Sequence, residues 1–552
     1  MRSLLPSVAG FLLLVSPLVI AEPRSQGEKP KLVVQITVDQ LRGDLPLRLY
    51  DRFGEKGFRY LMDEGAQFHA AHYSHAITET APGHATLYTG SNPREHGIIG
   101  NEWFDSGTGM KVYNCEDERH AILGEEPRAG SGTSPVNLLS STITDEVILA
   151  SGRAARVFGV SVKDRGAILP AGHYGKAFWY SGSKGEFVTS DYYYDEYPAW
   201  ASEWNASGVV GSYQEKSWKL FAPLGSYIAA ESDDRACERS YMHLGRTFPH
   251  PLAAPDGSGL SKAVRYTPVG DELVFSFARK LVEAEKLGRG SSTDFLTLSF
   301  SSTDYVGHAF GPLSLEAEDN LLHLDNLLAQ LFTFLDEQVG LDKVLVVLSA
   351  DHGAPDCPDM LADLGYDVGW VDSVAMLKSA NAAVKAYFET DETLLRAHVT
   401  PYLWLDHDLI AEMNLDADEV ASVVAAGALE TGGLDLAIPR WQLEGMELPD
   451  SPLNRRIRAA FHGDRSGDVY LVPQQQWLIG TGNAKSVLAS LHGSPWSYDT
   501  HVPIFFAGPG VTPGDFYRQV APRDIAPTIA AMLGVKPPTA CSGTVLVEVL
   551  GE

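Results

Sequence analysis

The chain has 552 residues, of which 44% are hydrophobic and 21% charged, and this composition is that of an ordinary globular protein. The formal net charge is −28, which makes the chain a poor candidate for holding the phosphate backbone of a nucleic acid, and we expect no nucleic-acid partner. The length allows one large elaborated domain or two to three smaller ones.

The first 21 residues have the pattern of a secretory signal peptide. Arg2 gives a positive start, an apolar run extends from Val8 to Ile20, and Ala21 offers a small residue for cleavage. The run is short for a bilayer span, so a membrane anchor is the lesser alternative. We therefore expect a mature protein, residues 22–552, that is periplasmic or secreted and keeps no stable membrane anchor.

The cysteines lie far apart in the sequence and form no CxxC pair, so they do not resemble a zinc knuckle. In an oxidising compartment we expect one or two disulfides, and the sequence leaves every pairing open. The cysteines are Cys115, Cys237, Cys357 and Cys541.

A buried strand and a helix are the first predicted elements. Lys31–Val38 is an apolar, β-branched run that ends at Asp39. Thr80, then Pro82 and an apolar run that stops at Gly90, predict a helix that begins at or beside Thr80. Because the N-terminus of a helix favours an anion, the Thr80 hydroxyl is either a helix cap, the commoner case, or a nucleophile.

A second strand is predicted at Arg156–Val162, and it runs into Lys163 and Arg165. Two cations beside a strand end are usually solvated, but they also suit an anionic substrate. Before this strand, Asn101 lies in a turn-rich segment and is either a turn residue or an amide donor aimed into a site. After it, residues from about 169 to 260 are rich in Tyr, Trp, Gly and Ser, which we interpret as an irregular insertion over the sheet.

A third strand, Asp294–Phe300, precedes Asp304 and His308, whose spacing places both side chains on one side of a helical turn. Leucines at helical spacing then predict a core-facing helix that stops at Gly340. A fourth strand, Lys343–Ala350, completes a strand–helix–strand crossover. We therefore expect the third and fourth strands to be parallel neighbours.

The last part of the chain contributes the remaining candidate residues. Asp351 and His352 follow the fourth strand directly. Residues from about 365 to 480 are interpreted as a second insertion. His492 comes next and is followed by a last predicted strand, Val502–Ala507.

Several polar residues lie one to four positions beyond the carboxyl end of a predicted strand, where open parallel sheets bind ligands. They are Asp39, Lys163, Asp304 and Asp351. Mixed carboxylate and imidazole ligands suit zinc, and the candidates are too many for one tetrahedral ion but suit two. The candidate ligands are Asp39, Asp304, His308, Asp351, His352 and His492. Two such ions can hold the attacking and leaving oxygens of an in-line displacement, with Thr80 attacking phosphorus.

A set of segments that occur in order resembles the alkaline phosphatase superfamily, and within it the phosphate-irrepressible, broad-specificity alkaline phosphatases that use a threonine nucleophile. The segments are VDQLRGD, TAPGHATLYTG, GNEW, KDRGAILPAG, DYVGH, ADHG, HGSPWSYDTHVP and DIAPT. The resemblance covers nearly the whole mature chain. It implies an α/β fold with a mostly parallel sheet flanked by helices, in a single catalytic domain whose insertions form a cap over the site.

The resemblance also implies roles for individual residues and two Zn²⁺ per chain. One zinc would take Asp304, His308 and His492. The other would take Asp39, Asp351, His352 and the Thr80 oxygen. Asn101, Lys163 and Arg165 would contact the phosphoryl oxygens. His492 is preferred over His501 because it heads the His-Gly pair where the ligand of the family falls.

The implied activity is hydrolysis of small-molecule phosphate monoesters through a covalent phosphothreonine on Thr80, with a broad substrate range. The alternative is a phosphodiesterase or nucleotide pyrophosphatase that uses the same two-zinc site. Lys163 with Arg165 favours the monoester, because a monoester presents three charged oxygens and a diester has one of them replaced. The intact Thr80 argues against a non-catalytic, metal-binding surface protein.

Overall fold

The structure is a computed structural model that describes residues 29–125, 132–231, 233–445, 448–480 and 484–551. The predicted signal peptide, residues 1–21, lies outside the described residues. Within the described ranges, every helix is too short or too polar to cross a bilayer.

The main sheet has nine strands in the order β19-β2-β18-β11-β1-β10-β5-β6-β7. Its centre is parallel and consists of β11 (Val344–Ser349), β1 (Leu32–Val38), β10 (Asp294–Phe300), β5 (Val157–Ser161) and β6 (Lys176–Ser181). The outer strands are β18 (Ile504–Ala507), β2 (Ala66–Phe68), β19 (Gly514–Phe516) and β7 (Glu186–Val188). Antiparallel pairs join β18 to β11, β2 to β18 and β7 to β6, so the prediction of a mostly parallel α/β sheet is confirmed.

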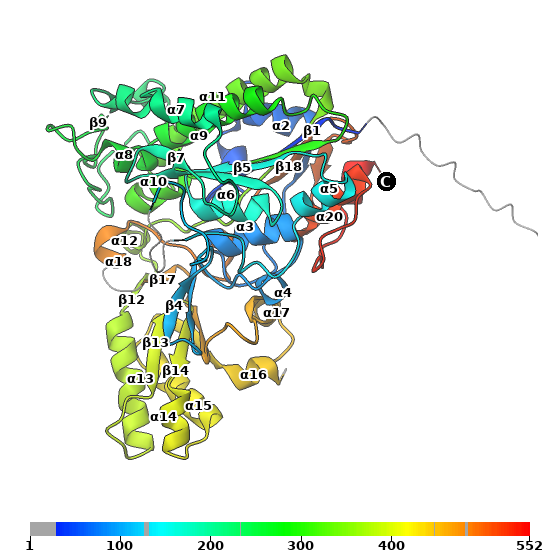
Figure 1. Ribbon diagram of the computed structural model, residues 1–552. Helices are drawn as coiled ribbons and strands as arrows, with labels where there is room; N and C mark the ends of the chain where they lie inside the picture. The colour runs from blue at the N-terminus through cyan, green and yellow to red at the C-terminus, as the bar shows by residue number, and fades with distance from the viewer. Residues whose placement is uncertain (1–28, 126–131, 232, 446–447, 481–483, 552) are drawn as a thin grey trace, which may run out of the picture.

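Helices cover both faces of this sheet (Figure 1). Alternate residues of β1 point to opposite faces, as the pleat of a strand requires. Leu32, Val34, Ile36 and Val38 pack into the core on one side, while Val33 packs on the other. The first core is closed by α2 (Phe58–Glu64), α9 (Val269–Glu285) and α11 (Leu315–Gln338), and the second by α3 (Thr80–Thr89), α5 (Ile143–Ala150) and α20 (Ile525–Leu533). Both faces of the central strands are therefore buried, which explains their continuous apolar runs.

Two expectations about the sheet are wrong. The third and fourth predicted strands, β10 and β11, run parallel but are not neighbours, because β1 lies between them and pairs with both. Residues 176–188 do not belong to an irregular insertion, since β6 and β7 form one edge of the main sheet. The apolar residues of β6 and β7 lie within a sequence rich in aromatic residues and glycine, and this sequence does not have the pattern of a strand.

A separate lobe is built from the later part of the chain and lies below the main sheet in Figure 1. Its sheet has the order β13-β14-β16-β15, with β13 Leu395–Val399, β14 Tyr402–Leu405, β16 Val469–Pro473 and β15 Leu434–Pro439. Helices α13 (Ser373–Tyr387), α14 (His407–Glu412) and α15 (Ala417–Leu429) pack on it around a core of its own. The chain enters and leaves this lobe through the parallel pair β12 (Gly369–Val371) and β17 (Trp477–Ile479).

Shorter elements complete the fold. A hairpin of β3 (Glu102–Asp105) and β4 (Met110–Tyr113) lies beside β13 of the lobe, and β8 (Ser217–Trp218) pairs with β9 (His250–Pro251). Helices α6 (Asp164–Ala171) and α10 (Ser302–Phe310) begin just after β5 and β10. The other helices are α1 Leu45–Arg48, α4 Pro93–His96, α7 Ala199–Ala206, α8 Leu260–Ala263, α12 Pro358–Asp363, α16 Arg440–Glu444, α17 Pro452–Ala460, α18 Ala484–Val487 and α19 Ser497–Thr500.

One disulfide joins Cys237 to Cys357 and spans 120 residues of sequence. Cys115 and Cys541 are free thiols, the first buried and the second half-buried. The structure therefore selects one pairing among those that the sequence leaves open.

Candidate active site

Four neighbouring strands bring their carboxyl ends together at one edge of the sheet. Asp351 follows β11, Asp39 follows β1, Asp304 comes after β10, and Lys163 comes after β5. All four side chains are buried. The Lys163 Nζ atom lies 2.7 Å from Asp39 Oδ2 and 2.5 Å from Asp304 Oδ2. These contacts make a charged cluster at the position where parallel sheets bind ligands.

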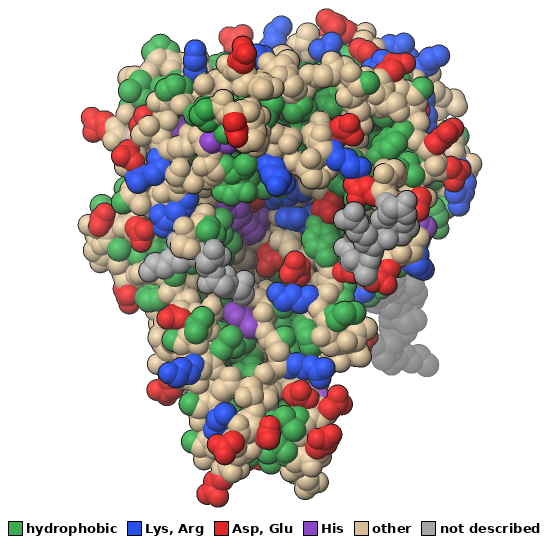
Figure 2. Space-filling model, turned by 60° about the vertical axis from the view of Figure 1, so that its left-hand side comes forward, with side chains coloured by type: hydrophobic (Ala, Val, Ile, Leu, Met, Phe, Trp, Pro, Cys, Tyr) green, Lys and Arg blue, Asp and Glu red, His purple; other side chains and the backbone are tan. Residues whose placement is uncertain are grey.

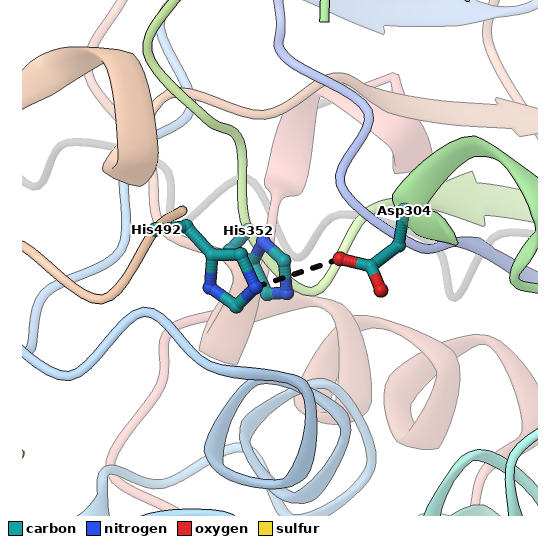
Figure 3. A group of neighbouring side chains, drawn as sticks. All are labelled: Asp304, His352 and His492. Carbon is teal, nitrogen blue, oxygen red and sulfur yellow. Dashed lines mark ion pairs between the residues drawn. The ribbon is translucent and has the colours of Figure 1, made fainter. Parts of the chain in front are cut away.

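The predicted metal ligands gather beside this cluster in two groups. Donor atoms of Asp304, His352 and His492 lie within 4.8 Å of one another, and so do those of Asp39, Asp351 and His352. Figure 3 shows the first group, in which His492 Nε2 is 3.5 Å from Asp304 Oδ1 and the rings of His352 and His492 stack at 3.6 Å. His308 joins the same group through its Nε2 atom, 3.2 Å from Asp304 Oδ1. His352 is thus shared between the groups, whereas the sequence assigns it to one.

The histidines are held in the form that binds a metal. Each directs its Nδ1 atom at a backbone carbonyl, and since a carbonyl only accepts, each Nδ1 carries the proton. The distances are 2.9 Å from His308 to the Ser490 oxygen, 3.0 Å from His352 to Gly353 and 2.7 Å from His492 to Thr78. The Nε2 lone pairs are therefore turned toward the carboxylates, which is the usual arrangement around metal-binding histidines.

Unpartnered acceptors indicate that the site fits a cation. His352 Nε2 and Asp39 Oδ1 are buried, lie 3.5 Å apart and have no hydrogen-bond partner among the described residues. Two lone pairs facing each other in a buried place are unfavourable unless a cation lies near both. The donor set of carboxylates and neutral imidazoles is one that zinc accepts.

Burial and neighbouring charges shift the pKa values of these groups. Burial, followed by the Asp351 charge, raises the pKa of Asp39 well above its usual value. Burial alone would also raise the pKa of Asp304, but His308 and Lys163 outweigh it and lower that pKa well below its usual value. Burial lowers the pKa of His352 to about 3, which keeps this imidazole neutral and able to bind a metal.

Thr80 is the first residue of α3, and Glu79 occupies the cap position. Its Oγ1 atom lies 3.3 Å from Lys163 Nζ and 3.5 Å from Arg165 Nη2. The helix can come this close to the strand ends because Gly83 has no side chain: a Cβ there would lie 2.2 Å from the Asp351 carbonyl oxygen. The Thr80 hydroxyl therefore faces the charged cluster at the N-terminus of a helix, where an anion is favoured.

Asn101 lies beside Thr80 and is fixed by two hydrogen bonds. Its backbone N–H donates to Glu79 Oε2 at 2.7 Å, and its side-chain oxygen accepts from the Ala81 N–H at 3.0 Å. The amide nitrogen of Asn101 is thus the end that can donate to a ligand. Burial raises the pKa of Glu79 to about 7.

Sequence reasoning missed several residues that hold the site in place. Gln40 has a left-handed backbone with φ of 68°, donates from Nε2 to Asp304 Oδ1 at 2.8 Å, and donates its backbone N–H to Asp351 Oδ1 at 3.0 Å. It therefore contacts a carboxylate of each metal group. Gly307 makes room for it, since a Cβ there would lie 1.9 Å from Gln40 Oε1. Neither periodicity nor composition marks Gln40; only its place beside Asp39 is a signal.

Tyr113 and His84 are two further residues of this kind. The Tyr113 hydroxyl accepts from Arg165 Nη1 at 3.2 Å and donates to Asp164 Oδ1 at 2.5 Å, which orients the guanidinium. His84 Nδ1 lies 2.8 Å from the Thr80 carbonyl oxygen and 3.2 Å from Asp351 Oδ2. His501, by contrast, directs Nε2 to the His69 carbonyl at 2.9 Å and belongs to neither metal group.

A cavity of about 540 Å³ opens above these residues. Its lining includes Thr80 and Lys163, Glu102 and Lys111 of the β3–β4 hairpin, and Val399 of the lobe. Figure 2 shows the hollow on this face, with histidine side chains inside and charged side chains around it. The site is therefore open to small molecules.

Comparison with known proteins identifies the family. The family model of type I phosphodiesterase / nucleotide pyrophosphatase matches residues 33–501. The chain is 34% identical over 546 residues to alkaline phosphatase PafA of Elizabethkingia meningoseptica, which covers 98% of each chain. It is also 36% identical over 529 residues, 95% of each chain, to a protein of Myroides odoratus named calcium-transporting ATPase.

The fold comparison agrees with the sequence comparison. The crystal structure of wild-type alkaline phosphatase PafA superposes with a TM-score of 0.89 at 34% identity and covers 95% of this chain and 99% of that one. Alkaline phosphatases at 29–34% identity match nearly the full length of the chain. The chain therefore belongs to the type I phosphodiesterase / nucleotide pyrophosphatase family within the alkaline phosphatase superfamily, and it is a phosphatase.

Proposed function

We propose that the chain is a zinc-dependent phosphate monoester hydrolase of broad substrate range that acts through a covalent phosphothreonine on Thr80. The observation that carries the proposal is the surroundings of the Thr80 hydroxyl. Two cations, Lys163 and Arg165, lie 3.3 and 3.5 Å from it. The same hydroxyl faces the carboxylates and imidazoles at the strand ends.

The proposed ligands fall into two sets. The first is Asp304, His308 and His492, and the second is Asp39, Asp351 and His352 with the Thr80 oxygen, so that two Zn²⁺ bind per chain. When bound, the ions supply positive charge that lowers the pKa of the threonine hydroxyl and stabilises charge on the leaving oxygen. The burial of the three carboxylates and of His352, and the orientation of the three Nε2 atoms, support this assignment.

In the reaction that we propose, Thr80 Oγ1 gives its proton to solvent and attacks phosphorus, the bond from phosphorus to the leaving oxygen breaks, and the leaving oxygen takes a proton from solvent. Lys163, Arg165 and the Asn101 amide hold the non-bridging oxygens, where charge is spread in the transition state. The phosphorylated Thr80 lies at the N-terminus of α3, whose free N–H groups favour the anion. Water then attacks phosphorus, inorganic phosphate leaves, and the Thr80 oxygen regains a proton.

A phosphodiesterase or nucleotide pyrophosphatase is the second candidate, because the description of the matching family model names both activities. The cations distinguish the candidates. A monoester carries nearly two charges near neutral pH and a diester one, so two cations at the phosphoryl oxygens suit the monoester better.

The test uses Thr80→Ala and Thr80→Ser on protein with verified metal content. We expect Thr80→Ala to keep its fold and metal but lose most turnover, and Thr80→Ser to keep a measurable part. Acid quenching during turnover of a labelled monoester should trap phosphate on wild-type Thr80 and none on Thr80→Ala. Turnover by Thr80→Ala at the wild-type rate would contradict the nucleophile. A rate panel of monoesters, diesters and sulfate esters would then separate the two candidate activities.

The proposed partners are small-molecule phosphate monoesters, and the proposed location is the periplasm or the extracellular medium. The support for this location is the signal pattern of residues 1–21. Fractionation of cells that express the full chain would test it, with the mature N-terminus read by mass spectrometry. An uncleaved chain in the cytoplasmic fraction would contradict it.

A further inference from the structure

We propose that the lobe and the segment before His492 form a binding subsite for an apolar leaving group. The preferred substrates of the site would then be monoesters of apolar alcohols or phenols. This inference rests on the proposed monoester hydrolysis at Thr80. The subsite is the aliphatic wall of the 540 Å³ cavity, and its residues are Val399, Ile479, Leu488 and Leu491.

The composition of this wall is the first observation. Most of the lining of the cavity is charged or polar, yet it also includes these four aliphatic side chains, together with Thr400 and Val487. Ile479 is buried, while Val399, Leu488 and Leu491 are half-buried and face the cavity. Apolar surface that stays open at the mouth of a polar site indicates a ligand that covers it.

The wall is held rigidly against the proposed metal ligands. The Ala489 N–H donates to the His308 carbonyl oxygen at 2.7 Å, and His308 Nδ1 donates to the Ser490 oxygen at 2.9 Å. Ser490 Oγ donates to the Pro355 oxygen at 2.7 Å. Leu488 and Leu491 flank this pair of residues, so the main chain that carries them is tied to His308.

The geometry of the proposed reaction aims a leaving group at this wall. In an in-line displacement the leaving oxygen lies opposite the Thr80 oxygen. In the proposed assignment it faces the donor group that contains His308 and His492. Leu491 immediately precedes His492, and Leu488 precedes the residue bonded to His308. Leu488 and Leu491 line the same cavity as His308 and His492, so the carbon chain attached to that oxygen can reach them.

The charged residues that the hairpin adds to the lining do not compete for apolar groups. Glu102 and Lys111 are exposed on the β3–β4 hairpin, and their charged ends lie 3.8 Å apart. Side chains of this kind stay hydrated. An apolar leaving group has one dry wall available, and a polar one can remain in water beside the hairpin.

The experiment measures kcat/KM for a series of n-alkyl phosphates from ethyl to hexyl, whose leaving alcohols have nearly the same acidity. Covering a methylene fully corresponds to about a fourfold gain and covering half of it to about twofold, so kcat/KM should rise about two- to fourfold per methylene. An ether analogue of hexyl phosphate, with oxygens in the chain, should lose most of this gain. The affinity of n-alkylphosphonate inhibitors, which are not turned over, should rise by the same factor per methylene.

Nearly isosteric polar substitutions test the wall itself. Leu488→Asn combined with Val399→Thr should reduce the gain in kcat/KM per methylene toward onefold, that is, toward no gain. Val399→Thr alone should reduce this gain if the double variant does not fold. The matched control is Val374→Thr on α13, a side chain that is 70% exposed and outside the cavity, and it should keep the wild-type slope.

Negative results of the experiment fall on two different claims. A flat series in an enzyme that hydrolyses ethyl phosphate would overturn the subsite and leave the proposed function intact. An unchanged slope in the double variant would likewise overturn the subsite. Failure of the metal-loaded wild type to hydrolyse any monoester would overturn the proposed function itself.

Discussion

A substitution at Gln40 tests whether the two metal groups are organised separately. Replacing it by methionine keeps the length of the side chain and removes the amide that donates to Asp304 Oδ1 at 2.8 Å. The backbone N–H of residue 40 still donates to Asp351, because that bond needs no side chain. Gln40→Met should therefore weaken one metal group and spare the other.

The magnitude follows from the bond that is lost. A hydrogen bond to a charged group contributes about 1.5–3 kcal/mol. Because every 1.4 kcal/mol corresponds to tenfold in affinity, zinc should bind about 10- to 150-fold more weakly at the group that contains Asp304. Changes of this order are typical when a residue that orients a metal ligand is removed.

The assay is a zinc titration in competition with a chromophoric chelator of known affinity, which resolves two binding phases in the wild type. We expect one phase to weaken in Gln40→Met and the other to stay. Gln475→Met, at an exposed glutamine of the lobe, is the matched control and should change neither. If the zinc affinity of both phases falls equally, Gln40 supports the fold in general. If the affinity of neither phase falls, the contact with Asp304 does not support zinc binding.

Three further predictions follow from other parts of the structure. Lys163→Ala with Arg165→Ala should lower monoester kcat/KM on the order of a hundredfold and diester kcat/KM much less, because two charge-assisted hydrogen bonds are lost; equal losses would favour general anion binding. Cys237→Ser opens the disulfide, which spans 120 residues, and should cost about 5 kcal/mol of stability by chain entropy. Its Tm should therefore fall in a non-reducing thermal melt, whereas Cys541→Ser, at a free thiol, should change Tm little. Burial and then a neighbouring carboxylate raise the pKa of Glu238 from 4.5 to about 8, so the folded state holds a proton that the unfolded state releases, and stability falls as pH rises through this window. Glu238→Gln should raise Tm at pH 9 and leave it nearly unchanged at pH 4; a gain of equal size at both pH values would contradict the shift.

The strand ends could be predicted from the sequence because their signal is local. An apolar run that stops at Asp39 or Asp351 identifies both the strand and the polar residue after it. Since parallel strands share one carboxyl edge, no knowledge of the strand order was needed to bring these residues together. The same reasoning holds for Lys163 and Asp304.

The parts of the fold and of the site that the sequence did not predict depend on contacts between distant segments. Placing β1 between β10 and β11 is a choice of partner that no local pattern encodes. The pairing of Cys237 with Cys357 likewise appears only when the chain is folded. Gln40 is harder still, because its role comes from a left-handed backbone and from room left by Gly307. Periodicity carries no information about such a position.

The three imidazoles and the carboxylates differ in how vulnerable they are to mutation. His308, His352 and His492 are oriented by carbonyl oxygens of the main chain, which are present whatever side chain the residue carries. A point mutation at Ser490 or Thr78 leaves that acceptor in place unless it moves the backbone. Asp39 and Asp304 instead depend on the side chains of Lys163 and Gln40, so random substitutions that loosen the site should act mostly through these two carboxylates.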